Sequence, residues 1–167
     1  SESEMVEVTI EVLPVNDAPL ALADEFVTDE DVAINLDLLQ NDSDIEGDDL
    51  TIANSNFTQP TNGTLQFLPD NQLQYTPNEN YFGTDSFTYR ASDSNGGESE
   101  MVEVTIEVLP VNDAPIAAND LVVVNEDSSV SIAVLENDSD IETAIANLQI
   151  ETFTQTANGT LQQVGNE

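Results

Sequence analysis

Hydrophobic and polar residues alternate with a period of two along much of the chain. Between residues 6 and 12, valine and isoleucine alternate with glutamate and threonine, the pattern of a strand with one buried and one solvated face. Asparagine, glycine and proline separate such runs and mark turns, as at Asn62-Gly63, Asn95-Gly96 and Pro69-Asp70-Asn71. No segment has a helical period. The strands expected between Leu20 and Leu109 are 21–28, 32–39, 50–57, 63–68, 72–76, 85–92 and 99–109.

Seven short strands in about 95 residues are typical of an immunoglobulin-like fold. The alternating pattern supplies the two faces that such a fold needs, one for the core and one for solvent. The sequence therefore predicts an all-β, seven-stranded antiparallel β-sandwich.

An internal repeat divides the chain. Residues 2–19 recur unchanged at 98–115, an offset of 96, and shorter blocks recur with the same offset. A period this long matches a string of whole domains rather than a solenoid. We expect residues 1–16 to be the last strand and linker of a preceding repeat, 17–112 a complete repeat, and 113–167 the first part of the next. The start at Ser1, without an initiator methionine, suggests a piece of a longer protein.

The charge of the chain restricts its partners. Lys and Arg together number one, Arg90, against 34 Asp and Glu, which gives a net charge of −33. Nucleic acid and anionic membrane surfaces are therefore excluded as partners, because both require basic side chains. The longest apolar runs are also far shorter than the roughly 18 residues that a membrane span needs.

The missing residue types restrict the chemistry. The chain has no histidine and no cysteine, which excludes Ser-His-Asp and Cys-His catalysis, ordinary zinc sites and disulfides. Abundant carboxylates, amides and hydroxyls are the ligands that hard cations prefer, above all calcium.

One loop concentrates acidic residues. Five carboxylates lie within residues 41–49, around Gly47. Two interpretations stay open for this loop: a solvated turn, or a turn that directs several oxygens at one calcium ion. It is not an EF-hand, since the spacing and the flanking helices differ. The glutamates of the strands, by contrast, fit solvated faces that maintain solubility.

Several motifs together resemble a known family. They are Phe87 to Asp93, Met101 to Val108, the Val111-Asn112-Asp113-Ala114-Pro115 junction, the Asn125-Glu126-Asp127 triplet and the run GTDSFTY at 83–89. In this order they resemble a cadherin-type repeat, and most closely the cadherin-like tandem repeats of giant secreted (RTX-type) bacterial adhesins. Cadherin-type repeats bind calcium between successive domains, so the resemblance implies calcium at each junction of this chain.

The resemblance also implies a ligand set for each junction. The set expected at the second junction is Asn112, Asp113, Asp138 and Asp140, with Glu126 or Glu30 from the acidic motif near the first strand. At the first junction it is Asn16, Asp17, Asp42, Asp44 and Asp48, with Asp93 closing the site. The sequence departs from the family pattern at Pro14 and Pro110, where an acid is expected, and at Thr143-Ala144, which suggests a weaker second loop.

The resulting hypothesis is a non-enzymatic, extracellular spacer repeat of a long bacterial cell-surface adhesin, stiffened by calcium so that it projects a terminal adhesion domain. The alternative is a directly adhesive module that binds another copy or a glycan. A carboxylate-pair glycosidase is disfavoured, because catalysis rarely needs the same site in successive repeats. The expected partners are neighbouring repeats of the same chain, with contacts to other copies through donation of the strand at 1–13 as a further possibility.

Overall fold

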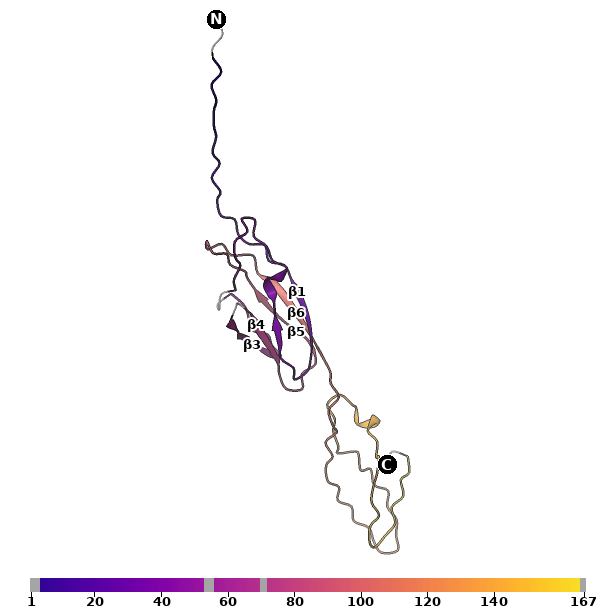
Figure 1. Cartoon of the computed structure of the whole chain (residues 1–167). Coiled ribbons are helices and arrows are strands. Elements are labelled where there is room, and N and C mark those ends of the chain that lie inside the picture. Colours follow the sequence, from indigo (N-terminus) through magenta and orange to yellow (C-terminus); the bar gives the residue numbers. More distant parts are fainter. Residues whose placement is uncertain (1–3, 53–55, 70–71, 166–167) are drawn as a thin grey trace.

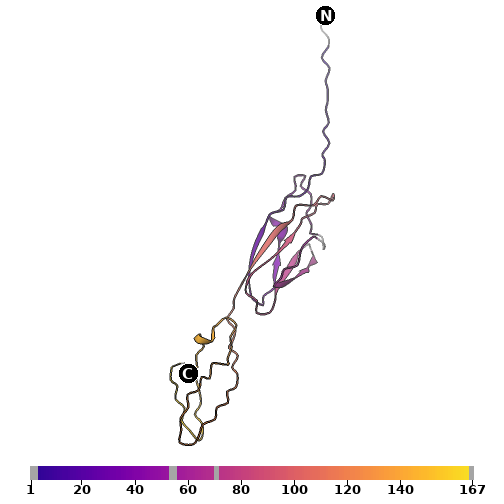
Figure 2. The same cartoon turned by 180° about the vertical axis from the view of Figure 1, so that it is seen from behind.

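The computed structural model describes residues 4–52, 56–69 and 72–165 (Figure 1). An extended N-terminal segment leads into a β-sandwich, and a linker then leads to the second repeat, on the opposite side of the sandwich (Figures 1 and 2). The strands are β1 (Asp24–Asp29), β2 (Ile34–Leu36), β3 (Gly63–Phe67), β4 (Leu73–Pro77), β5 (Gly83–Tyr89) and β6 (Val102–Leu109). The helices described are two short 3₁₀ turns, η1 (Leu38–Gln40) and η3 (Ile145–Asn147). Neither could cross a membrane.

Two three-stranded sheets form the sandwich of the first repeat. One has the order β1-β6-β5 and the other β2-β4-β3. The expected all-β sandwich is therefore present. One pair differs from the purely antiparallel prediction: β1 runs parallel to β6, with Asp24 opposite Val104 and Asp29 opposite Leu109. The two strands consequently end at the same edge of the sheet.

Two of the predicted strands differ from the structure. The expected strand at 50–57 forms only isolated bridges, Thr51 to Ser92 and Phe57 to Tyr89, and residues 53–55 lie outside the described residues. From one bridge to the other the chain advances by six positions on this segment but by three on its partner, so the two bridges do not share one regular register. The expected strand at 32–39 keeps only β2, because η1 follows almost at once. In the turn predicted at 69–71, residues 70 and 71 also lie outside the described residues.

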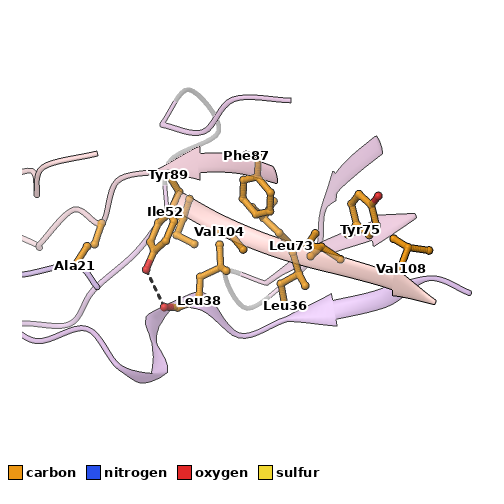
Figure 3. Close-up of a cluster of buried hydrophobic side chains, with 12 residues drawn as sticks. Ala21, Leu36, Leu38, Ile52, Leu73, Tyr75, Phe87, Tyr89, Val104 and Val108 are labelled. Atoms are coloured by element: carbon orange, nitrogen blue, oxygen red, sulfur yellow. Dashed lines mark hydrogen bonds between the residues drawn. The ribbon is translucent and has the colours of Figure 1, made fainter. Parts of the chain in front are cut away.

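The alternating positions of both sheets fill one hydrophobic core (Figure 3). Burying such side chains contributes about 1.5–3 kcal/mol each to folding. Tyr89 is fully buried, and its hydroxyl donates a hydrogen bond to the carbonyl oxygen of Leu38 at 2.9 Å (Figure 3). The core residues are Ala21, Leu36, Leu38, Ile52, Leu73, Tyr75, Phe87, Tyr89, Ala91, Val104, Ile106 and Val108.

The segments on either side of the sandwich lack this packing. The valine and isoleucine side chains of residues 4–13 are at least 80% exposed, although the same sequence forms β6 in the first repeat. Within 113–165 the structure has the isolated bridge between Ile116 and Ser139 and the turn η3, but no paired strands. An open pocket of about 440 Å³ lies there among apolar and polar side chains. Phe153, for example, is 45% exposed.

Candidate functional site

Parallel pairing of β1 and β6 brings an acidic residue to the linker between the repeats. Glu30 directly follows β1, and its backbone N–H donates to the carbonyl oxygen of Leu109 at 2.8 Å. Its side-chain Oε1 accepts a hydrogen bond from the backbone N–H of Val111 at 2.5 Å. Asp31, next in sequence, has a φ of 60°, which aspartate tolerates better than most residues. The chain therefore turns sharply while Glu30 stays beside the linker.

The linker and the second repeat supply the other acids. The backbone N–H of Asp113 donates to Oε2 of Glu142 at 2.9 Å. The turn that carries Glu142 is held by Asp140, whose Oδ1 accepts hydrogen bonds from the backbone N–H groups of Glu142 (3.2 Å) and Thr143 (2.6 Å). As a result, Glu30, Asp113 and Glu142 each place one carboxylate oxygen within 4.8 Å of the others. We call these three residues the junction group.

The junction group is electrostatically unsatisfied. Glu30 is only 3% exposed, and its Oε2 is buried without a hydrogen-bond partner, as are Oδ2 of Asp113 and Oε1 of Glu142. Two unit charges 4.8 Å apart repel by about 3 kcal/mol at an effective dielectric constant of about 20. A hard cation among these oxygens would turn the repulsion into attraction and satisfy all three oxygens.

A second set of acids lies at the opposite end of the first repeat. Asp44, Asp48 and Asp93 also place one oxygen each within 4.8 Å of one another, and we call them the loop group. Oδ1 of Asp44 accepts the backbone N–H groups of Glu46 (2.9 Å) and Asp48 (3.2 Å), which closes the acidic loop on itself. Oδ2 of Asp44 is buried without a partner.

Asp93 is the best satisfied member of the loop group. Its Oδ2 accepts the side-chain amide of Asn16 at 2.9 Å, and its Oδ1 accepts the backbone N–H groups of Asn95 (2.9 Å) and Gly97 (2.7 Å). The hydrogen bond from Asn16, assisted by those from the backbone, lowers the pKa of Asp93. The linker asparagine thus reaches the expected site, where Gly97 leaves room because a β-carbon there would collide with Asp93.

One amide and one hydroxyl contact the carboxylate of Asp48. The side-chain amide of Asn95 donates to its Oδ2 at 2.6 Å, and the hydroxyl of Ser94 approaches its Oδ1 at 3.4 Å. At the position of Asp48 the second repeat has Ala144, and Thr143 replaces Gly47, whose φ is +77°. The second loop therefore cannot repeat the same backbone path, and it lacks the counterpart of one loop-group carboxylate.

Asp42 and Asp138 make structural contacts. Oδ1 of Asp42 accepts the backbone N–H of Leu22 at 2.9 Å. Its Oδ2 lies 2.9 Å from the hydroxyl oxygen of Tyr89 and shares the single proton of that hydroxyl with the carbonyl oxygen of Leu38. Asp138 accepts the backbone N–H of Ala118 at 2.8 Å, at the equivalent position. These contacts tie each acidic loop to the first segment of its repeat. Neither residue belongs to the two acid groups found among the described residues.

A half-buried pair of acids, Asp24 and Asp42, lies beside Tyr89. Burial raises the pKa of Asp42. Burial, assisted by the charge of Asp42, raises the pKa of Asp24 to about 6. Oδ1 of Asp24 accepts the amide of Asn41 at 3.0 Å, whereas Oδ2 is buried without a partner. Burial also raises the pKa of Tyr89, so its hydroxyl stays a donor.

The two linkers repeat the same contacts. Asp17 donates its backbone N–H to Oε2 of Glu46 at 3.2 Å, as Asp113 does to Glu142. The side-chain amides of Asn16 and Asn112 donate to the carbonyl oxygens of the aspartates that follow them, at 3.0 and 2.8 Å. Local linker geometry therefore follows from the local sequence.

The structure brings together some of the expected ligands. Glu30 meets Asp113, and Asp44, Asp48 and Asp93 meet one another, with Asn16 alongside. Glu126 is exposed and lies in neither group. Sequence reasoning did not identify Glu142. The block Asn-Asp-Ser-Asp-Ile-Glu, which recurs at 41–46 and 137–142, carried a signal for it, because its glutamate repeats together with the two aspartates.

Similarities to known proteins are partial. The chain is 38% identical over 78 residues to Protein GAMETE EXPRESSED 2 of Arabidopsis thaliana, covering 47% of this chain but only 8% of that protein. An endo-fucoidan hydrolase from glycoside hydrolase family 107 matches with a TM-score of 0.41 and 29% identity, over 56% of this chain and 14% of that one. A 2,6-sialyltransferase of Photobacterium sp. JT-ISH-224 matches with a TM-score of 0.38 and 14% identity, over 55% of this chain and 18% of that one.

A family model describes most of the chain. The model of the bacterial Ig domain matches residues 16–107 and again residues 112–167. The first match ends inside β6, the last strand of the sandwich, and the second begins in the linker that follows it. The sandwich of two β-sheets and the tandem repeat both agree with this match. The chain belongs to the bacterial Ig domain family, whose members typically serve as structural or extender repeats of surface proteins.

Proposed function

We propose that the chain is a calcium-stiffened spacer from a long bacterial cell-surface adhesin. Calcium would bind at the junctions between repeats and hold them in line, so that the rod carries a terminal adhesion domain away from the cell. The part played by this chain is mechanical rather than catalytic. The junction group carries the proposal, because its three carboxylates come from both repeats and from the linker between them.

The junction group favours a hard cation with oxygen ligands. Each of its carboxylates offers one unpartnered oxygen, while the backbone N–H groups of Val111 and Asp113 occupy the second oxygens of Glu30 and Glu142. The acids are therefore oriented before a cation binds, and little side-chain entropy is lost on binding. Extracellular modules typically bind calcium with a dissociation constant of about 10⁻⁴–10⁻³ M, which matches the outside medium rather than the cytosol.

The mechanism follows from where the ligands lie. Glu30 moves with the first repeat, Glu142 with the second, and Asp113 with the linker. Without a cation, repulsion among the three drives the repeats apart and favours bent arrangements. With a cation, attraction at close range, where salt screening over about 8 Å does little, holds both repeats to the linker.

Small-angle scattering of the chain tests the proposal. In millimolar calcium the maximum dimension and the stiffness should rise relative to EDTA. Asp113→Ala should abolish that response without unfolding the sandwich, since Asp113 lies outside the core. Asp49→Asn, which changes an exposed acid outside both groups, should respond like the wild type. A wild type that does not respond, or an Asp113→Ala variant that responds equally, would contradict the stiffening mechanism.

A second candidate, association between copies, rests on the N-terminal segment. Residues 6–13 have the sequence of β6, yet their apolar side chains are exposed. This segment could donate a strand to another copy, beside residues 120–125, which correspond to β1. Light scattering after size exclusion would detect association that increases with concentration. A monomer at all concentrations would exclude this candidate.

A further inference from the structure

An asparagine that the proposed function does not use lies next to the loop group. Asn95 precedes Gly96, and both are exposed. The side-chain amide of Asn95 donates to Oδ2 of Asp48 at 2.6 Å, and its backbone N–H donates to Oδ1 of Asp93 at 2.9 Å. The side chain of Asn95 therefore contacts one acid of the loop group and its backbone contacts another.

The residue after Asn95 permits a reaction at this amide. Gly96 has a φ of +95°, and no heavy atom would contact a β-carbon there. A glycine leaves its own backbone nitrogen open to approach by the preceding side chain, because no side chain shields it. Asn95 and Gly96 thus combine a solvent-exposed amide with a backbone nitrogen that no side chain of its own residue shields. The backbone N–H groups of both residues face Asp93, and the amide is held by Asp48.

We propose that Asn95 is a site of spontaneous deamidation, and that the reaction adds a fourth carboxylate to the loop group. The backbone nitrogen of Gly96 forms a bond to Cγ of Asn95 as the bond from Cγ to Nδ2 breaks. The proton of the Gly96 nitrogen leaves with Nδ2 as ammonia, which gives a cyclic succinimide. Water then adds to either carbonyl of the ring and opens it to aspartate or isoaspartate, with no oxidant or reductant.

The aspartate product changes how the loop group responds to cations. In the unmodified chain the amide of Asn95 acts as a hydrogen-bond donor that partly neutralises Asp48. Aspartate at 95 would replace this attraction with repulsion between two carboxylates, and would offer a cation one more oxygen ligand. Deamidation therefore weakens the loop without calcium and strengthens its binding of calcium. This consequence rests on the proposed cation function, whereas the reaction itself does not.

The chain provides matched internal controls. Asn62-Gly63 is the same dipeptide, but it is only partly exposed and Gly63 begins β3. The backbone N–H of Asn62 donates to Asp85, its carbonyl oxygen accepts from Asn78, and Gly63 packs against the ring of Tyr75. Asn158-Gly159 is an exposed turn far in sequence from either acid group. The deamidation rate of Asn62 therefore shows the effect of a rigid backbone. The deamidation rate of Asn158 shows how fast the reaction runs in an open turn.

Peptide mapping by mass spectrometry tests the proposal on the whole chain, incubated at neutral to mildly alkaline pH in EDTA or in millimolar calcium. Asn95 should convert at least about tenfold faster than Asn62, the ratio that a 1.4 kcal/mol restraint gives. Calcium should slow Asn95 but leave Asn158 unchanged, because a cation holding Asp48 and Asp93 fixes the loop. The variant Asn95→Asp should bind calcium more tightly in calorimetry than Asn95→Gln, which keeps an amide.

The outcomes separate the two proposals. An intact Asn95 after Asn158 has converted in EDTA would overturn the deamidation site. In a second outcome, scattering shows that calcium stiffens the chain, but calcium does not slow the deamidation of Asn95. This outcome would overturn the coupling between Asn95 and the loop group. Conversion in EDTA in a chain that does not bind calcium would support the reaction while contradicting the proposed spacer mechanism.

Discussion

The junction group and the loop group use the same kind of side chain, but the protein satisfies them differently. Glu30, Asp113 and Glu142 each leave one buried oxygen without a partner, and they come from both repeats and the linker. In the loop group, by contrast, amides and backbone N–H groups already occupy Asp93 and Asp48, and only Oδ2 of Asp44 stays buried without a partner.

This difference suggests a division of roles. Hydrogen bonds from the protein replace much of what a cation would do in the loop group, so that loop can keep its shape without one. In the junction group backbone N–H groups reach one oxygen each of Glu30 and Glu142, and one buried oxygen of every member stays without a donor. Its charges oppose the arrangement that brings the repeats together. Dependence on a cation should therefore be concentrated at the junction rather than spread over every acidic cluster.

The largest effect is expected at a buried acid that the protein satisfies completely. Asp85 is 4% exposed and accepts hydrogen bonds from the backbone N–H groups of Thr61 and Asn62 and from the hydroxyl of Tyr75. Asp85→Ala should destabilise the first repeat by about 3 kcal/mol, because these donors lose their partner. Urea unfolding followed by tyrosine fluorescence measures this, since all three tyrosines lie in the first repeat.

The Asp85→Ala variant also distinguishes the effect of losing a buried hydrogen-bond acceptor from the effect of losing a cation ligand. The loss of stability in Asp85→Ala should be the same in EDTA and in calcium, because no other acid shares its contacts. If calcium restored stability to the variant, simple hydrogen-bond satisfaction would not explain the role of Asp85.

The second effect tests the junction group directly. Calcium at 100 times its dissociation constant should stabilise the chain by about 2.7 kcal/mol. Glu30→Gln should remove most of this gain, since it deletes the most buried of the unpartnered charges. Asp44→Asn in the loop group should remove less. Thermal melts of both variants with and without calcium give the comparison, and equal losses would show that the two groups do not differ as proposed.

A third, smaller effect depends on pH. The pKa of Asp24 is raised from 3.8 to about 6 by burial, so the folded state binds its proton more tightly than the unfolded state. The stabilisation is complete below pH 3.8 and is lost as the pH rises through about 6. Because the carboxyl is partly solvated, the contribution should be about 1 kcal/mol.

Replacing Asp24 with asparagine isolates this contribution. Asp24→Asn should be more stable than the wild type at neutral pH, and its stability should vary less between pH 4 and 6. Denaturant unfolding across this pH range measures both. If the stability of the variant depended on pH as that of the wild type does, the dependence would arise from other acids, such as Asp42.

The smallest effect is expected from the one basic side chain. Arg90 pairs with Glu98 at 3.5 Å, and both side chains are substantially exposed, at 39% and 49%. Arg90→Ala should therefore change stability by less than about 0.5 kcal/mol. Urea unfolding measures the change. A larger loss of unfolding free energy would show that the positive charge of Arg90 stabilises the acidic chain more than the comparison of the two acid groups implies.

The sequence by itself determined the repeat, the all-β class and the chemistry. The offset of 96, the period-two alternation and the absence of histidine and cysteine are properties of the chain that no tertiary contact alters. Local contacts also followed from it: the linker contacts of Asp17 and Asp113 are nearly the same, because the sequences around them are identical.

Only the tertiary structure decided which acids meet. The alternation of apolar and polar residues shows which side chains face the core. Strands pair through backbone groups that are the same in every residue, so the alternation does not show which strand pairs with which, or in which direction. Parallel pairing of β1 with β6 places Glu30 beside Asp113 and Glu142. The hydroxyl of buried Tyr89 and the backbone N–H of Leu22 hold the side chain of Asp42, which therefore joins neither acid group among the described residues.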